Sequence, residues 1–220
     1  MNEKDFRLFA RDHHVSGQLL DDYVGYIEPT IIEERRLNAT QISVFSRLFM
    51  ERILFLGSEI NSDVANIVNS QLLYLQTENP DKAITLYINS PGGSVYDGMS
   101  IYDVAKYVSC PICTTCCGMA ASMGAVLLSS GDKGMRTALP HSQIMIHQPS
   151  GGTGRVQASD MEIAWKEMKK CKDMLYQILS ENTGRPVEEI EALCDRDKWY
   201  TAKEAVEQGL IDSVITKKKK

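Results

Sequence analysis

Long apolar segments and targeting signals are absent from this sequence of 220 residues. No run of about 18 apolar residues occurs, so we expect no transmembrane helix and no contact with a membrane. The opening Met1-Asn2-Glu3-Lys4-Asp5 leads into no apolar core, which argues against a secretory signal, and it is too acidic for an ordinary transit peptide. We therefore expect a cytoplasmic protein.

An excess of basic residues is also missing. The 24 Lys and Arg stand against 29 Asp and Glu, giving a formal net charge of −5, which argues against a nucleic-acid-binding protein. The only basic run, Lys217–Lys220, is expected to be a solvated tail. The Ser90-Pro91-Gly92-Gly93-Ser94 segment is not a nucleotide-binding loop, because no G-K-[ST] follows it, and we expect no cofactor.

Six cysteines remain to be explained, four of them spaced C-x2-C-x2-C-C at Cys110, Cys113, Cys116 and Cys117. This spacing resembles a metal or cluster site. However, residues 112–117 read as a buried strand, in which Cys116 and Cys117 would face opposite ways and could not easily share one ion. We favour free buried thiols and predict no metal.

The chain divides into segments of different character. Residues 1–28 show weak periodicity and are expected to be a removable extension, and residues 29–41 a hairpin or loop. Residues 42–216 are expected to form the main folded domain, called the head below. Its predicted strands and helices alternate: helix 42–51, strand 52–56, a helix capped at Ser62-Asp63 and ending near 76, strand 84–89, a helix to about 108, strand 112–117, a helix opening at 118–123, and strands 136–139 and 143–147. This order predicts an α/β fold with a mainly parallel sheet.

A long helix is predicted over residues 157–181. Apolar side chains recur there at helical spacing, and we expect them to form core or a subunit interface: Met161, Ala164, Trp165, Met168, Cys171, Met174, Leu175 and Ile178.

Ser122 and His147 are the residues best placed for chemistry. Ser122 sits among small residues between a strand and a helix, where backbone N–H groups can face an oxyanion. A helix-capping serine is an equally good reading, and the strict G-x-S-x-G pattern is not met. His147 ends an apolar strand, where it is either a base or a structural histidine. Asp195 and Asp197 are candidate acids, or only a charge cluster that ends a helix.

Together these segments resemble the proteolytic subunits of the ATP-dependent Clp proteases, peptidase family S14. The matching stretches are Tyr87–Ser94, Gly118–Gly124, Met145–Pro149, and Asp195–Asp197 running into Thr201–Ala205 and Gly209–Asp212. The resemblance covers about residues 29–215. It implies a ClpP/crotonase-like α/β fold with repeated β-β-α-type units and a projecting handle helix at 157–181.

The resemblance also implies roles for individual residues. Ser122 would be the nucleophile, His147 the general base and Asp197 the orienting acid. The backbone N–H groups of Gly93 and Met123 would bind the oxyanion. A substrate strand would lie along Ser94-Val95 and Pro149-Ser150, and Asp195 and Arg196 would link two rings.

At the level of the assembly, the resemblance implies two stacked heptameric rings of identical subunits, with residues 29–41 at the axis, fed with unfolded polypeptides by an AAA+ unfoldase that uses the ATP. Two alternatives stay open. A hydratase or isomerase of the crotonase group shares the fold but typically uses acidic residues, so labelling of Ser122 by a fluorophosphonate would argue against it. An inactive ring subunit typically lacks part of the triad and would cleave no peptide.

Overall fold

The computed structural model describes residues 30–35, 38–152 and 154–216. The chain forms two compact units, Met1–Glu51 and Arg52–Lys220, so the head expected from residue 42 spans their boundary. The predicted extension (1–28) and tail (217–220) lie outside the described residues.

In the first unit, β1 (Thr30–Arg35) and β2 (Asn38–Ser43) form an antiparallel hairpin, from Thr30 opposite Ser43 to Arg35 opposite Asn38. A hairpin was one of the two predictions for this segment. The helix expected from residue 42 is α3 (Val44–Met50), because Ser43 ends β2 and its side chain accepts a hydrogen bond from Phe45 N.

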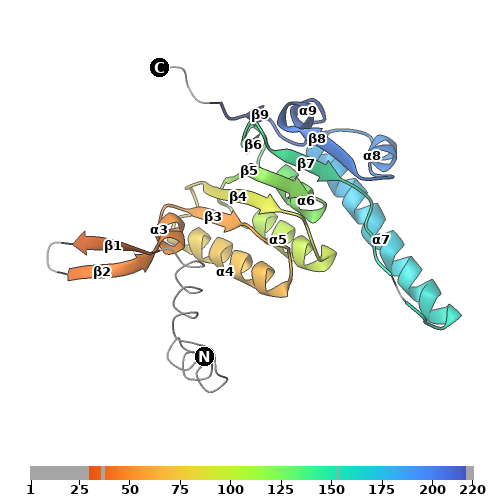
Figure 1. The fold of residues 1–220 in the computed structure, drawn as a ribbon, viewed down its shortest axis with the longest axis horizontal. Coiled ribbons are helices and arrows are strands. Elements are labelled where there is room, and N and C mark those ends of the chain that lie inside the picture. Colours follow the sequence, from red (N-terminus) through yellow and green to blue (C-terminus); the bar gives the residue numbers. More distant parts are fainter. Residues whose placement is uncertain (1–29, 36–37, 153, 217–220) are drawn as a thin grey trace, which may run out of the picture. The chain divides into compact units, whose positions relative to one another are not determined.

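The second unit alternates strands and helices around a seven-stranded sheet (Figure 1). Five strands, β3 to β6 and β9, run parallel in the order β3-β4-β5-β6-β9; β7 also pairs with β5 in parallel, and β8 pairs antiparallel with β7. The α/β class with a mainly parallel sheet is confirmed. The elements are β3 (Ile53–Leu56), α4 (Ser62–Glu78), β4 (Ile84–Ser90), α5 (Val95–Tyr107), β5 (Ile112–Ala121), α6 (Met123–Ser129), β6 (Arg136–Ala138), β7 (Gln143–Ile146), α7 (Ala158–Thr183), α8 (Val187–Leu193), β8 (Lys198–Thr201), α9 (Ala202–Glu207) and β9 (Ser213–Val214).

Helical spacing predicts that Val64, Ile67, Val68 and Leu72 share the face of α4 that packs on this sheet. Val68 and Leu72 are buried, together with Ala65 and Leu75, whereas Val64 is half-buried and Ile67 is exposed. The cap also differs: the side chain of Asn61, rather than Ser62 or Asp63, accepts the hydrogen bond from Val64 N at 3.0 Å. Spacing therefore identified the helix and part of its buried face, but the placement of Ile67 on that face was wrong.

The long strand β5 positions the site, because its two halves have different neighbours. Thr114–Cys116 pairs with β6, and Met119–Ala121 pairs with β7. The helix expected to open at Gly118 is therefore wrong there: β5 continues to Ala121, and α6 begins at Met123. Since β8 runs antiparallel to β7, the beginning of β8 lies at the same sheet edge as the ends of β5 and β7.

The cysteines predicted on a buried strand do lie on β5 or beside it, and all six are free. Cys116 is fully buried while Cys117, the next residue, is only partly so, as expected for neighbours that face opposite sides of a strand. Within the described part of the chain, no three His, Cys, Asp or Glu side chains gather as a metal site would require. None of its helices combines the length and apolar character needed to cross a bilayer.

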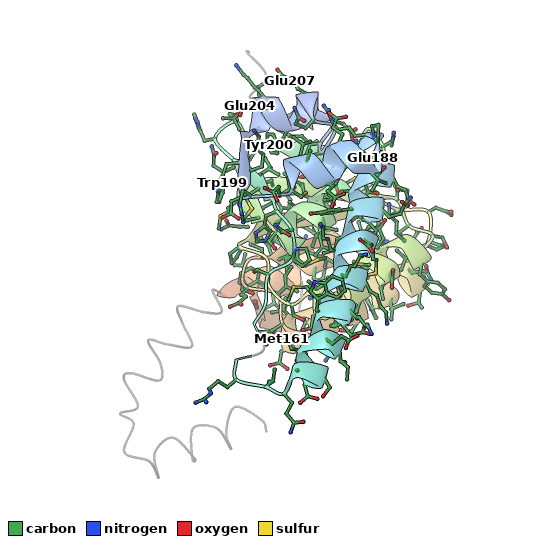
Figure 2. All side chains as sticks on the ribbon, turned by 90° about the vertical axis from the view of Figure 1, so that its right-hand side faces the viewer. Met161, Glu188, Trp199, Tyr200, Glu204 and Glu207 are labelled. Carbon is green, nitrogen blue, oxygen red and sulfur yellow. The ribbon has the colours of Figure 1, made fainter. Side chains whose placement is uncertain are left out.

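Helix α7 projects away from the sheet (Figure 1). The buried residues of its apolar stripe, Cys171, Leu175 and Ile178, lie in the second half, while Met161 and Trp165 in the first half are exposed. Figure 2 shows Met161 near the far end of the helix, well away from Trp199 and Tyr200 of β8. The first half therefore has no core of its own within the described chain.

Candidate active site

Ser122 occupies a sharp turn between β5 and α6. Its backbone has φ 54° and ψ −124°, and only Arg52 among the other described non-glycine residues has a positive φ. Such a conformation costs about 1–3 kcal/mol and persists only where its surroundings impose it. Here the N–H of Ser122 donates to Met145 O at 2.8 Å, which ties the turn to β7.

The side chain of Ser122 does not cap α6, so the helix-capping alternative is not what this structure shows. Its Oγ lies 2.8 Å from Nε2 of His147, which follows the last residue of β7. On the other side of the ring, Nδ1 of His147 lies 3.0 Å from Oδ1 of Asp197, just before β8. The three predicted side chains thus meet at the shared sheet edge.

This arrangement defines which nitrogen of the neutral His147 ring carries the proton. A carboxylate only accepts hydrogen bonds, so Nδ1 carries the proton and donates to Asp197. Nε2 is then an acceptor facing the Ser122 hydroxyl. In Asp195, the other candidate acid, Oδ2 instead lies 3.9 Å from Nε of Arg196, and both of these side chains are strongly exposed.

Gly93 and Met123, the residues expected to offer backbone N–H groups to an oxyanion, lie in the loop after β4 and at the first position of α6. The backbone N–H of Ile60 donates to Gly92 O, and the carbonyl of Ile60 accepts from the N–H of Ser94. Because these bonds flank Gly93, the Gly93 N–H points away from Ile60. Met123 is the first residue of α6, where N–H groups have no acceptor within the helix. The Met123 side chain is buried.

Comparison with known proteins decides the family. The family model described as Clp protease matches residues 36–218. The curated relatives include the ATP-dependent Clp protease proteolytic subunit of Porphyromonas gingivalis, 53% identical over the full length of both chains. Those of Bacteroides fragilis and Bacteroides thetaiotaomicron, of the same name, are 51% identical over 97% of this chain and 99% of theirs.

The chain belongs to the Clp protease family. It is accordingly a serine-type endopeptidase, a proteolytic subunit of an ATP-dependent protease. Membership excludes the hydratase alternative, and the fold is that of the family.

In this Clp protease, a small apolar cleft of about 20 Å³ lies beside Ser122 and His147. Its other walls are apolar, among them Val95, Val126, Ile146, Pro149, Leu175 and Leu179. Of the predicted substrate-strand residues, Val95 and Pro149 line the cleft, Ser150 is exposed, and the Ser94 N–H already donates to Ile60 O.

The buried cysteines of this Clp protease do not compete as nucleophiles. Burial raises the pKa of the Cys194 thiol to about 12 and that of Cys116 to about 11. Because the thiolate is the reactive form, both thiols stay protonated and inert at neutral pH.

Sequence reasoning missed most of the helices and strands that position Asp197. Strands β8 and β9 and helix α9 were not predicted, and α8 was anticipated only as a helix that the charges at Asp195 and Asp197 would end. One signal was available: Thr201-Ala202-Lys203-Glu204 is a capping box, in which Thr201 N donates to Glu204 Oε2 and Glu204 N to Thr201 Oγ1. It marks the start of α9 and hence the end of β8.

Proposed function

We propose that Ser122, His147 and Asp197 form the catalytic triad of this endopeptidase. The supporting observation is the chain of contacts from Ser122 Oγ to His147 Nε2 (2.8 Å) and from His147 Nδ1 to Asp197 Oδ1 (3.0 Å). Ser122 attacks the peptide carbonyl while His147 takes its proton, and Asp197 stabilises the imidazolium that forms. The N–H groups of Gly93 and Met123 stabilise the oxyanion.

The reaction then passes through an acyl-enzyme. The N–H of His147 Nε2 protonates the leaving amine, and a water molecule repeats the attack with His147 again as base. No metal or cofactor takes part in this proposal, and ATP is used by a partner. The narrow cleft beside Ser122 supports a small role for side-chain recognition.

The substrates we propose are unfolded polypeptides, held as an added strand along Ser94-Val95 and Pro149-Ser150 and delivered by an AAA+ unfoldase in the cytoplasm. The subunits form two stacked heptameric rings, with residues 29–41 at the axis and Asp195 and Arg196 at the contact between rings. Support comes from the names of the relatives, which are subunits of ATP-dependent proteases, and from the exposure of Asp195 and Arg196.

Replacing the nucleophile tests the proposal. The Ser122→Ala variant should lose peptidase activity at least about 10⁴-fold while keeping the particle mass, because the hydroxyl forms the covalent intermediate. A Ser70→Ala control changes an exposed serine on α4 and should behave as wild type. A fluorophosphonate should label the wild type at Ser122 and fail to label the variant; wild-type turnover by Ser122→Ala would refute the triad.

The same pair of proteins tests residues 1–28, which we propose to be a propeptide removed by the enzyme itself. Mass spectrometry should find a shortened chain for the wild type and an intact one for Ser122→Ala. Identical full-length chains in both would contradict the proposal.

A further inference from the structure

The segment that carries Asp197 is short and exposed. It connects Cys194, which ends α8, to Lys198, which begins β8. The side chain of Asp197 is 64% exposed, and its contact with His147 is the only hydrogen bond or ion pair seen for this carboxylate in the described part of the chain. Something other than burial must therefore keep the carboxylate within reach of the imidazole.

The ladder between β7 and β8 stops just before the site. Its last pair is Ile146 opposite Lys198, and a regular continuation would place Gln148 opposite Arg196. Instead, the N–H of Gln148 donates to Cys194 O at 2.7 Å, two residues further back along the chain. The segment that carries the acid thus bulges between two fixed points, Lys198 and Cys194.

The side chain of Gln148 adds a second attachment inside this bulge. Its Nε2 donates to Asp195 O at 2.7 Å. Only the NH₂ end of the amide can face a carbonyl oxygen, so this contact also defines the orientation of the amide. Gln148 therefore holds two consecutive carbonyls of the acid segment while being bonded in sequence to His147.

We propose that Gln148 is the positioning residue that aligns Asp197 with His147, an assignment that rests on the proposed triad. It has no role in bond making or breaking. By holding the carbonyls of Cys194 and Asp195, it keeps Asp197 Oδ1 within hydrogen-bonding distance of His147 Nδ1. Removing the side-chain donor frees the bulge while leaving the backbone bond intact.

The Gln148→Met variant tests this directly, because it keeps the length of the side chain and removes its donor. We expect kcat to fall about ten- to a hundredfold, since a misplacement of about 1 Å costs on that order, with KM within about twofold. Gln143→Met is the matched control: Gln143 is the first residue of β7, the strand that leads to Gln148, and its side chain is exposed, so this variant should keep wild-type kcat.

A second variant separates positioning from a general loss of structure. In Gln148→Glu, the introduced carboxyl faces the Asp195 carbonyl and donates to it only when protonated. Lys169, Lys172, Asp173 and Glu191 line the same hollow as Gln148, but Lys172 is paired with Glu191 and Lys169 lies over the Trp165 ring. The Asp195 carbonyl and the Asp173 carboxylate should therefore raise the pKa of the introduced carboxyl above the ordinary value of about 4.3. We expect the kcat of Gln148→Glu relative to wild type to increase at least about threefold from pH 8 to pH 5.5. The same ratio for Gln148→Met should not change with pH.

Wild-type kcat in Gln148→Met, or a ratio for Gln148→Glu that is independent of pH, would overturn the role of Gln148. If Gln148→Met loses the assembled particle, as judged by sedimentation, the ratio for Gln148→Glu decides alone. These failures differ from failure of the triad, in which Ser122→Ala would be as active as wild type and the role of Gln148 would fall with it.

Discussion

At the scale of single residues, the turn of Ser122 depends on the absence of a side chain at Gly92. A Cβ at Gly92 would lie 2.7 Å from both Ala121 O and Ser122 Cβ, and the φ of Gly92 is +96°. The buried hydroxyl of Ser90 fixes the same loop, since it donates to Ser58 O and accepts from Gly92 N. The loop that carries Gly93 is thus packed directly against the nucleophile.

We predict that Gly92→Ala destabilises the fold by about 1–3 kcal/mol from backbone strain alone, and that the clash displaces Ser122 and lowers kcat/KM at least about tenfold. Thermal unfolding and a peptide assay measure the two effects. Gly57→Ala is the control, because a Cβ there meets nothing within 4 Å, and it should change neither quantity appreciably. Equal behaviour of the two variants would contradict this explanation.

The residues of the site were predicted more completely than the backbone conformation and tertiary contacts that hold them. Ser122, His147 and Asp197 were named from motifs, and they meet in the structure. The positive φ of Ser122 could not be predicted, because a search for G-x-S-x-G tests residue types rather than backbone angles. Spacing alone left Asp195 and Asp197 equivalent; the bulge held by Gln148 is a tertiary feature, and it separates them.

At the scale of elements, an ion pair between the buried Arg136 and the half-buried Asp212 joins β6 to the start of β9. The guanidinium of Arg136 on β6 bonds to both carboxylate oxygens of Asp212, just before β9, and to Asn182 O of α7. Asp212 also accepts from the backbone N–H of Arg136 and of Gly134. The hydrogen bond from the Arg136 side chain, more than any other interaction, holds the pKa of the Asp212 carboxyl below its ordinary value.

We predict that Asp212→Asn lowers the free energy of unfolding by about 2–4 kcal/mol near neutral pH, because it leaves a buried guanidinium without its partner. A depressed pKa means that the ionised pair stabilises the fold above about pH 4 and loses this effect as the pH falls through the lowered pKa. The difference from wild type should therefore shrink below pH 4.

Urea unfolding across pH measures this difference. The control Asp103→Asn changes an exposed carboxylate on α5 and should leave the free energy of unfolding unchanged at every pH. If the loss of unfolding free energy in Asp212→Asn stayed constant below pH 4, the loss would not come from the ion pair with Arg136.

The elements themselves were predictable where strands and helices alternate with clear periodicity. From β3 to β7 each expected strand and helix exists, with shifted ends. Beyond α7 the elements shorten to between two and seven residues, too short for periodicity to identify. Ile67 of α4 was wrongly expected on the buried face, because it is apolar and next to the buried Val68, and only tertiary packing separates the two.

At the scale of the whole molecule, α7 carries apolar surface that the described chain does not cover. Met161, Ile163 and Trp165 are all more than half exposed, and Lys169 lies over the Trp165 ring at 5.8 Å. Exposed large apolar side chains grouped on one projecting element are typical of an interaction surface. In the stacked rings that we propose, this half of the helix would be covered by another subunit.

We predict that Trp165→Lys weakens the contact between the rings, so that sedimentation finds particles of half the wild-type mass. Aromatic anchors at interfaces commonly contribute about 2 kcal/mol or more, and every subunit loses the anchor at once. The neighbouring Lys166→Ala removes only an exposed charge paired with Glu162 and should leave the mass unchanged. An intact double ring in Trp165→Lys under dilution would show that Trp165 is not part of that contact.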